Sequence, residues 1–232
     1  MRAVAIARTP TTTNPEATAP VDPHWLDRVA GATSLLSRLL LGPPHGPLLV
    51  ALSAPDVWAD WPFRDDVDSR AGLQRLSRSV AAGGTERLEQ LGADYQQLFL
   101  GPQRVLACPY ESVYLGDEHL TFGSQTLAVR QWYRRYGLRA PAEGREPDDH
   151  IGLELGFVSH LCVLGLDALE QGSDGSAREL RVAVGAFAAE HLLRWADECL
   201  DHVAEEAATD FYRGVAGLTR GVLRILEADL GS

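Results

Sequence analysis

The sequence predicts an all-α fold: a single-domain helical bundle with a long aromatic- and proline-containing loop between its central helices. Apolar residues recur at the spacing of an α-helix through almost every long segment, whereas the alternation that marks a half-buried strand is nearly absent. These segments open with capping residues and close at glycine or proline. With 232 residues, of which 45% are hydrophobic and 23% are charged, the chain can bury a sizeable core.

The first helix is expected to start after Asp22, which acts as its N-cap, and to end before Gly42. Pro23 suits the first helical position, because its missing N–H has no partner there in any case. The inner face of this segment is predicted to carry Trp25, Val29, Ala32, Leu36 and Leu39.

The next two helical regions follow directly. Residues 48–80 are expected to be mostly helical, with breaks near Pro55 and Pro62. A further helix opens at Thr85 and ends before Gly101. Its apolar stripe consists of Leu88, Leu91, Tyr95 and Leu98.

Four more helices complete the prediction. They are expected over 124–137, from about 148 to 171, from a capping box formed by Ser176 and Glu179, and from Thr209 onward. The helix that follows the capping box should be continuous. Its stripe runs through Val184, Ala188, Leu192, Trp195 and Cys199.

The non-helical segments define the domain organisation. Residues 1–21 are predicted to be a disordered tail, which leaves 22–232 as one all-helical domain. Residues 100–123 form a long loop in which 112–114 is expected to be extended, and 138–147 form a second loop. Long loops inside a compact domain are usually functional or disordered, and the apolar residues of this one argue against disorder.

Composition excludes several classes of function. All 21 cationic side chains are arginine, and the net charge is −11, so no basic surface for nucleic acid is expected. P-loop and Schiff-base chemistry need a lysine, and the chain has none. Three scattered cysteines without a CxxC pair indicate neither a disulfide framework nor a zinc site.

The distribution of apolar residues predicts the location of the protein. No apolar stretch is expected to reach the roughly 18–20 uncharged residues that cross a bilayer, so no stable membrane association is predicted. The N-terminal segment, residues 1–7, is too short to contain the apolar region of a secretion signal. We therefore expect a cytoplasmic protein.

The densest polar group is Pro147, Asp148, Asp149 and His150, followed one helical turn later by Glu154. One interpretation is structural, with an aspartate as N-cap and His150 paired with Glu154. A second leaves the carboxylates free for a cationic ligand. A third uses Asp149, His150 and Glu154 in a metal site, as in all-α metal-dependent hydrolases.

Aromatic residues gather around the long loop. Tyr95, Leu98 and Phe99 end the second stripe and can simply be core residues. The prolines and tyrosines of the loop form a stiff aromatic surface suited to holding a peptide. These loop residues are Pro109, Tyr110 and Tyr114.

Three motifs occur in a characteristic order and spacing: 95–102 (YQQLFLGP), 109–114 (PYESVY) and 146–157 (EPDDHIGLELGF). Together they resemble the TorD/DmsD family of cytoplasmic chaperones for molybdenum-containing redox enzymes. The resemblance implies a non-catalytic, all-helical chaperone without a cofactor of its own. Its implied partner is the twin-arginine signal peptide of an apo-form reductase subunit, held until the molybdenum cofactor is inserted. Homo-oligomers formed by helix exchange are compatible with it.

The resemblance and the residue patterns together define a predicted peptide-binding set. A twin-arginine signal combines cationic residues with an apolar segment, so it needs carboxylates beside a hydrophobic groove. Asp148 and Asp149 are expected to pair with the two arginines. The full predicted set is Tyr95, Leu98, Phe99, Pro109, Tyr110, Tyr114, Pro147, Asp148, Asp149, His150 and Glu154.

Overall fold

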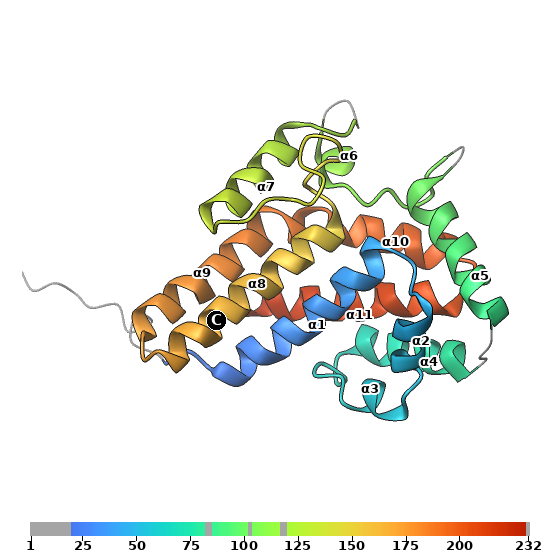
Figure 1. Ribbon diagram of the computed structural model, residues 1–232, viewed down its shortest axis with the longest axis horizontal. Helices are drawn as coiled ribbons and strands as arrows, with labels where there is room; N and C mark the ends of the chain where they lie inside the picture. Colours follow the sequence, from blue (N-terminus) through green and yellow to red (C-terminus); the bar gives the residue numbers. More distant parts are fainter. Residues whose placement is uncertain (1–19, 82–84, 102–103, 117–119, 231–232) are drawn as a thin grey trace, which may run out of the picture.

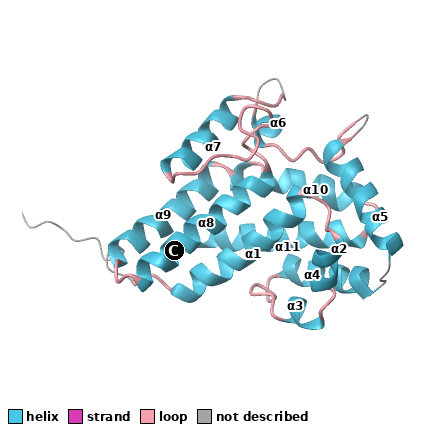
Figure 2. Cartoon of the chain, viewed as in Figure 1, coloured by secondary structure: helices cyan, strands magenta, loops and turns pink. Residues whose placement is uncertain are grey.

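The computed structural model describes residues 20–81, 85–101, 104–116 and 120–230, and this part of the chain is helical without β-strands (Figures 1 and 2). The all-α prediction is confirmed. The helices are α1 (Pro23–Leu41), α2 (Gly46–Leu52), α3 (Pro55–Ala59), α4 (Val67–Ala81), α5 (Thr85–Tyr95), α6 (Glu111–Leu115), α7 (Ser124–Arg135), α8 (Ile151–Glu170), α9 (Asp174–Glu190), α10 (Ala196–Glu206) and α11 (Asp210–Leu230). The predicted tail, 1–21, lies outside the described residues except for its last two.

The long helices form the core of the molecule. Helix α8 packs against α1 and α9, while α11 packs against α4, α10 and α1 (Figure 1). Their buried apolar side chains make one continuous cluster. Short helices α6 and α7 lie together over the start of α8, so the segment that contains Tyr110 and α6 sits on this core rather than within it.

Helix ends follow the capping signals of the sequence. The Asp22 carboxylate accepts a hydrogen bond from the His24 N–H at 2.9 Å, as predicted for an N-cap. Helix α7 ends in a Schellman motif: the Gly137 N–H donates to Arg134, and the Leu138 N–H donates to Tyr133 at 2.8 Å. Gly137 has a φ of 75°, which favours glycine at this position.

The prediction of one continuous helix from Ser176 through Cys199 is wrong. Helix α9 begins at Asp174 and ends at Glu190, and a 3₁₀ turn over Leu192–Arg194 precedes α10. His191 leaves helical geometry, and its imidazole hydrogen-bonds the distant Glu111 carboxylate at 2.8 Å. The apolar stripe continues across the break, which is why periodicity alone misses it.

Three smaller expectations also need correction. Residues 112–114 are helical within α6 and not extended. The second stripe ends in a π-helical turn, Gln96–Leu100, rather than in a regular α-helix. Helix α8 starts at Ile151 with His150 as its N-cap, so neither Asp148 nor Asp149 caps it.

Among the described helices, α8 comes nearest to a membrane span, although Glu154, Asp167 and Glu170 keep it short of the 18–20 uncharged residues named above. Its length and its mean hydropathy, 1.5 over its most apolar window, would suit a membrane span. Of that window, 61% is buried inside the protein, mainly against α1 and α9. This packing is that of a central helix in a helical core.

Candidate functional site

Main-chain pairing brings two distant motifs together at the start of α8. Tyr110 and His150 form an isolated antiparallel bridge. The Glu111 N–H donates to the Asp149 carbonyl at 3.0 Å, and the Ile151 N–H donates to the Pro109 carbonyl at 2.8 Å. The long loop and the acidic motif, forty residues apart in sequence, are therefore held in fixed register.

The Asp149 side chain connects this junction to α6 and α7. Its carboxylate is fully buried and accepts hydrogen bonds from the Ser112 N–H at 2.7 Å and the Thr126 hydroxyl at 2.5 Å. These donors belong to α6 and α7. Because hydrogen bonds to a charged acceptor are stronger than neutral ones, Asp149 strongly favours this arrangement of the two short helices.

Asp148 has a different set of partners. It is fully buried, and its two oxygens accept a bidentate pair from Arg130, with Nε at 2.7 Å and Nη2 at 3.2 Å. Its carbonyl accepts from the Tyr133 hydroxyl at 3.2 Å. In this structure both aspartates are therefore occupied within the protein, contrary to the expectation that they pair with the arginines of a ligand.

His150 caps α8 and faces Tyr110. Its Nδ1 accepts from the Gly152 N–H at 2.9 Å, which leaves the proton of the neutral ring on Nε2. Burial lowers the pKa of His150 to about 4, and the neighbouring Asp149 charge only partly opposes this. The Tyr110 and His150 rings meet edge-on with their centroids 5.2 Å apart.

Glu154 does not pair with His150 as the structural interpretation of the motif expected. It is fully buried, and one oxygen accepts from the Trp195 indole at 3.4 Å. Burial, reinforced by the Glu111 charge, raises the pKa of Glu154 well above its usual range, so a neutral carboxyl is favoured. Glu111 in turn lies 2.8 Å from His191.

Asp149, His150 and Glu154 do not form the ligand set that a hydrolytic metal site would need. Within the described residues, no group of three or more His, Cys, Asp or Glu side chains could hold a metal ion. Asp149 faces α6 and α7, His150 uses Nδ1 as a cap, and Glu154 faces Trp195. Because these three side chains do not converge, the structure gives the hydrolase interpretation no support.

Tyr95, Leu98 and Phe99 lie in the core. All three are buried, and the Tyr95 hydroxyl donates to the Leu40 carbonyl at 3.2 Å. The Ala107 N–H donates to the Leu98 carbonyl at 2.8 Å, which fixes the start of the long loop against the π-helical turn. This hydrogen bond ties the buried turn to the loop that carries Tyr110.

Two other predicted residues support the loop further along. Pro109 is buried. Tyr114 is half-buried, with its ring 5.3 Å from Trp195 and its hydroxyl 3.4 Å from Nδ1 of His202. Both residues anchor the segment on either side of Tyr110.

One cavity of about 250 Å³ opens where the motifs meet, and we call it the Tyr110 pocket. Its walls combine apolar side chains with one rim carboxylate, Glu146, which is exposed and has no ion-pair partner among the described residues. From the predicted set it includes Tyr110, Pro147 and His150, and not the other members. The lining is Leu41, Tyr110, Ala140, Pro141, Ala142, Glu146, Pro147, His150 and Leu153.

The prediction missed the residues that complete this pocket. Leu41 is the exposed last residue of α1, 140–142 belong to the second loop, and Leu153 lies on the first turn of α8. The one available signal was in the second loop, where Pro141 and Pro147 stiffen a short segment directly before the acidic motif.

Comparison with known proteins agrees with this architecture. Residues 64–201 match the family described as "Nitrate reductase delta subunit". The chain is 32% identical over 184 residues to the Tat proofreading chaperone DmsD of Salmonella typhi, covering 79% of each chain. It is 31% identical over 179 residues to the chaperone protein TorD of Shewanella pealeana, covering 74% of each.

A helical core that carries a motif-built apolar pocket, together with these relatives, defines a redox-enzyme maturation chaperone. The chain belongs to the TorD/DmsD family.

Proposed function

We propose that this protein binds, in the cytoplasm, the twin-arginine signal peptide of a molybdenum-containing reductase subunit and holds it until the cofactor is inserted. The observation that supports this most is the Tyr110 pocket, an apolar cavity with a carboxylate at its rim. The name of the similar Salmonella typhi chaperone refers to Tat proofreading, which is consistent with this ligand class.

Within this proposal the pocket receives one large apolar side chain of the signal peptide. Complete burial of a leucine-sized side chain is worth about 2 kcal/mol, so a pocket of this kind accounts for part of the affinity. Tyr110 and Leu153 form apolar walls and Pro141 stiffens the second loop. Ordering a flexible peptide opposes binding, so further contacts along the loops are required.

Glu146 is the carboxylate best placed to meet an arginine of the ligand. Asp148 and Asp149 are occupied by Arg130, Ser112 and Thr126, whereas Glu146 is exposed at the pocket rim. An exposed ion pair contributes little affinity and mainly sets register and encounter rate. The two buried aspartates then support binding indirectly, by holding the pocket walls in place.

Calorimetric titration with a synthetic twin-arginine signal peptide tests the proposal. We expect saturable binding that Tyr110→Ala weakens about tenfold or more and Glu146→Gln weakens about threefold to fivefold. A peptide with two lysines should bind more weakly, because lysine cannot make a bidentate pair. Equal binding by Tyr110→Ala and the parent, at unchanged helical content, would overturn the assignment of this pocket.

A further inference from the structure

A second cavity, of about 430 Å³, lies between the end of α4, the middle of α5 and the start of α11. It shares no residue with the Tyr110 pocket. Figure 1 shows α4 below and α7 above the long central helices in that view. Its lining is Arg78, Ser79, Arg87, Gln90, Ala208, Thr209, Asp210 and Arg213.

The charge of this lining is opposite to that of the whole chain. Three guanidinium groups face one carboxylate, a surplus of two positive charges in a protein of net charge −11. Asp210 is already engaged, at 3.0 Å from Arg75 and 3.3 Å from Arg78. Neither Arg87 nor Arg213 has a carboxylate partner within the part of the chain that the structure describes.

Buried donors without partners mark where a ligand would bind. Nε and Nη2 of Arg87, and the hydroxyl of Ser79, are covered and have no hydrogen-bond partner among the described residues. Ser79 is 3% exposed. Burial lowers the pKa of Arg87 and the Asp210 charge opposes this, yet an arginine stays protonated. Native proteins rarely leave such donors unsatisfied, so a hydrogen-bond acceptor is expected there.

The geometry of these donors selects the class of acceptor. Nε–H and Nη2–H lie on one edge of the guanidinium and form a planar fork that matches two oxygens of an oxyanion. A single carboxylate would neutralise only half of the charge surplus. A phosphate monoester, with a charge of about −1.5 to −2 near neutral pH, matches it.

We propose that this cavity binds a phosphate group, carried by inorganic phosphate or by a small phosphate monoester. The Arg87 fork and the Ser79 hydroxyl donate to its oxygens, and the Arg78 and Arg213 charges compensate the rest.

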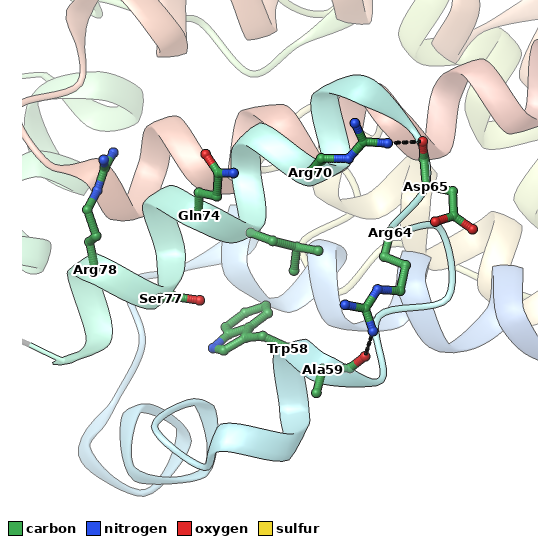
Figure 3. A pocket seen from close by; sticks show the side chains of 9 residues that line it. Trp58, Ala59, Arg64, Asp65, Arg70, Gln74, Ser77 and Arg78 are labelled. Atoms are coloured by element: carbon green, nitrogen blue, oxygen red, sulfur yellow. Dashed lines mark hydrogen bonds between the residues drawn. The ribbon is translucent and has the colours of Figure 1, made fainter.

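A neighbouring groove of about 800 Å³ extends this positive lining and shares Arg78 with the cavity. Figure 3 shows Arg78 at one end of it and Arg64 and Arg70 at the other. Arg64 donates to the Ala59 carbonyl at 2.8 Å and Arg70 to the Asp65 carbonyl at 3.0 Å, so neither hydrogen bond neutralises their charge. With Trp58 and Leu73 as apolar walls, the groove has room for the organic part of a monoester.

Calorimetry and thermal unfolding of the full chain with inorganic phosphate and with phenyl phosphate test the proposal, using acetate and chloride at equal ionic strength as controls. We expect saturable phosphate binding and a phosphate-specific rise in Tm. Arg87→Gln should weaken binding about tenfold or more and Ser79→Ala about threefold, because each removes direct donors. Arg194 is an exposed arginine on the 3₁₀ turn, and the Arg194→Gln control should bind phosphate like the parent.

Tighter binding of phenyl phosphate than of inorganic phosphate would identify a monoester that uses the groove, and equal binding would identify the free ion. The proposal is overturned if acetate and chloride match phosphate, if neither phosphate compound binds saturably, or if Ser79→Ala and Arg87→Gln both bind as the parent does. Should Arg87→Gln fail to fold, Ser79→Ala alone decides the matter. Binding of an acidic peptide in place of phosphate would also contradict it.

Discussion

At the scale of single residues, Asp149 connects more of the site than any of its neighbours. Its buried oxygens accept hydrogen bonds from the Ser112 N–H at 2.7 Å and from the Thr126 hydroxyl at 2.5 Å. Removal of the carboxylate leaves two buried donors without a partner, and each such group costs about 1–3 kcal/mol. A substitution here therefore acts on folding first and on binding second.

We predict that Asp149→Ala lowers the free energy of unfolding by about 3 kcal/mol or more. Denaturant titration followed by circular dichroism measures this. Asp27→Ala, at an exposed position on α1, is the matched control and should change stability by less than about 0.5 kcal/mol. An Asp149→Ala protein as stable as this control would show that the buried hydrogen bonds contribute nothing.

The stability of the folded protein depends on pH through His150. Its pKa is lowered to about 4 in the folded protein, whereas an unfolded histidine titrates near 6.5. Between these values the unfolded chain takes up a proton and the folded chain does not. Stability is therefore lost as the pH falls from 6.5 toward 4, by about 3 kcal/mol in total.

We predict that His150→Asn removes this part of the pH dependence, because asparagine accepts the cap hydrogen bond and does not titrate. Unfolding free energies at pH 7 and pH 5 for the parent and the variant provide the comparison. The parent should lose more stability on acidification than the variant. Equal losses would mean that His150 is not held neutral.

At the scale of elements, α4 and α11 are in unusually close contact. A Cβ atom built on Gly72 would lie 2.7 Å from the Gly214 carbonyl oxygen, and one built on Gly214 would lie 2.6 Å from Cγ of Leu76. These contacts involve backbone and a buried leucine, so neither can move freely. The two helices need glycine at this crossing in order to pack.

We predict that Gly72→Ala lowers the free energy of unfolding by about 1–3 kcal/mol through overpacking. Gly31→Ala is the control, because the added Cβ would have no atom within 4 Å in the middle of α1. That change should raise stability by about 0.5–1 kcal/mol. Thermal unfolding compares the two, and a stabilised Gly72→Ala protein would contradict the packing described here.

Elements defined by local signals were predictable, and elements defined by distant contacts were not. The boundaries of α1 and α7 follow from Asp22, Pro23 and Gly137, whose effects are local. The break after α9 depends on His191 reaching Glu111, eighty residues away. No periodicity contains that information, because the apolar stripe runs through the break unchanged.

The same division holds for the site. The family resemblance and the residue patterns placed Tyr110 and the acidic motif in one set, and the bridge between Tyr110 and His150 brings the two together. The roles of Asp148 and Asp149 depended on Arg130 and Thr126, which lie on α7 at no characteristic spacing. A carboxylate that is free and one that is buried look identical in sequence, so the sequence alone could not show that both aspartates have partners within the protein.

At the scale of the whole molecule, the chain separates two kinds of surface. The Tyr110 pocket is apolar with an acidic rim, which suits a ligand that is both cationic and apolar. The cavity between α4, α5 and α11 gathers arginines and would repel such a ligand. A signal peptide should therefore be directed to the region near α6, α7 and the start of α8.

Site-specific photo-crosslinking to a twin-arginine signal peptide tests this most directly. A photoreactive residue at Leu41, 43% exposed beside the Tyr110 pocket, is compared with one at Val182, 70% exposed on α9. We predict strong crosslinking from position 41 that excess unlabelled peptide abolishes, and little from position 182. Crosslinking that is equal at both positions, or that favours position 182, would contradict the proposed location of the peptide.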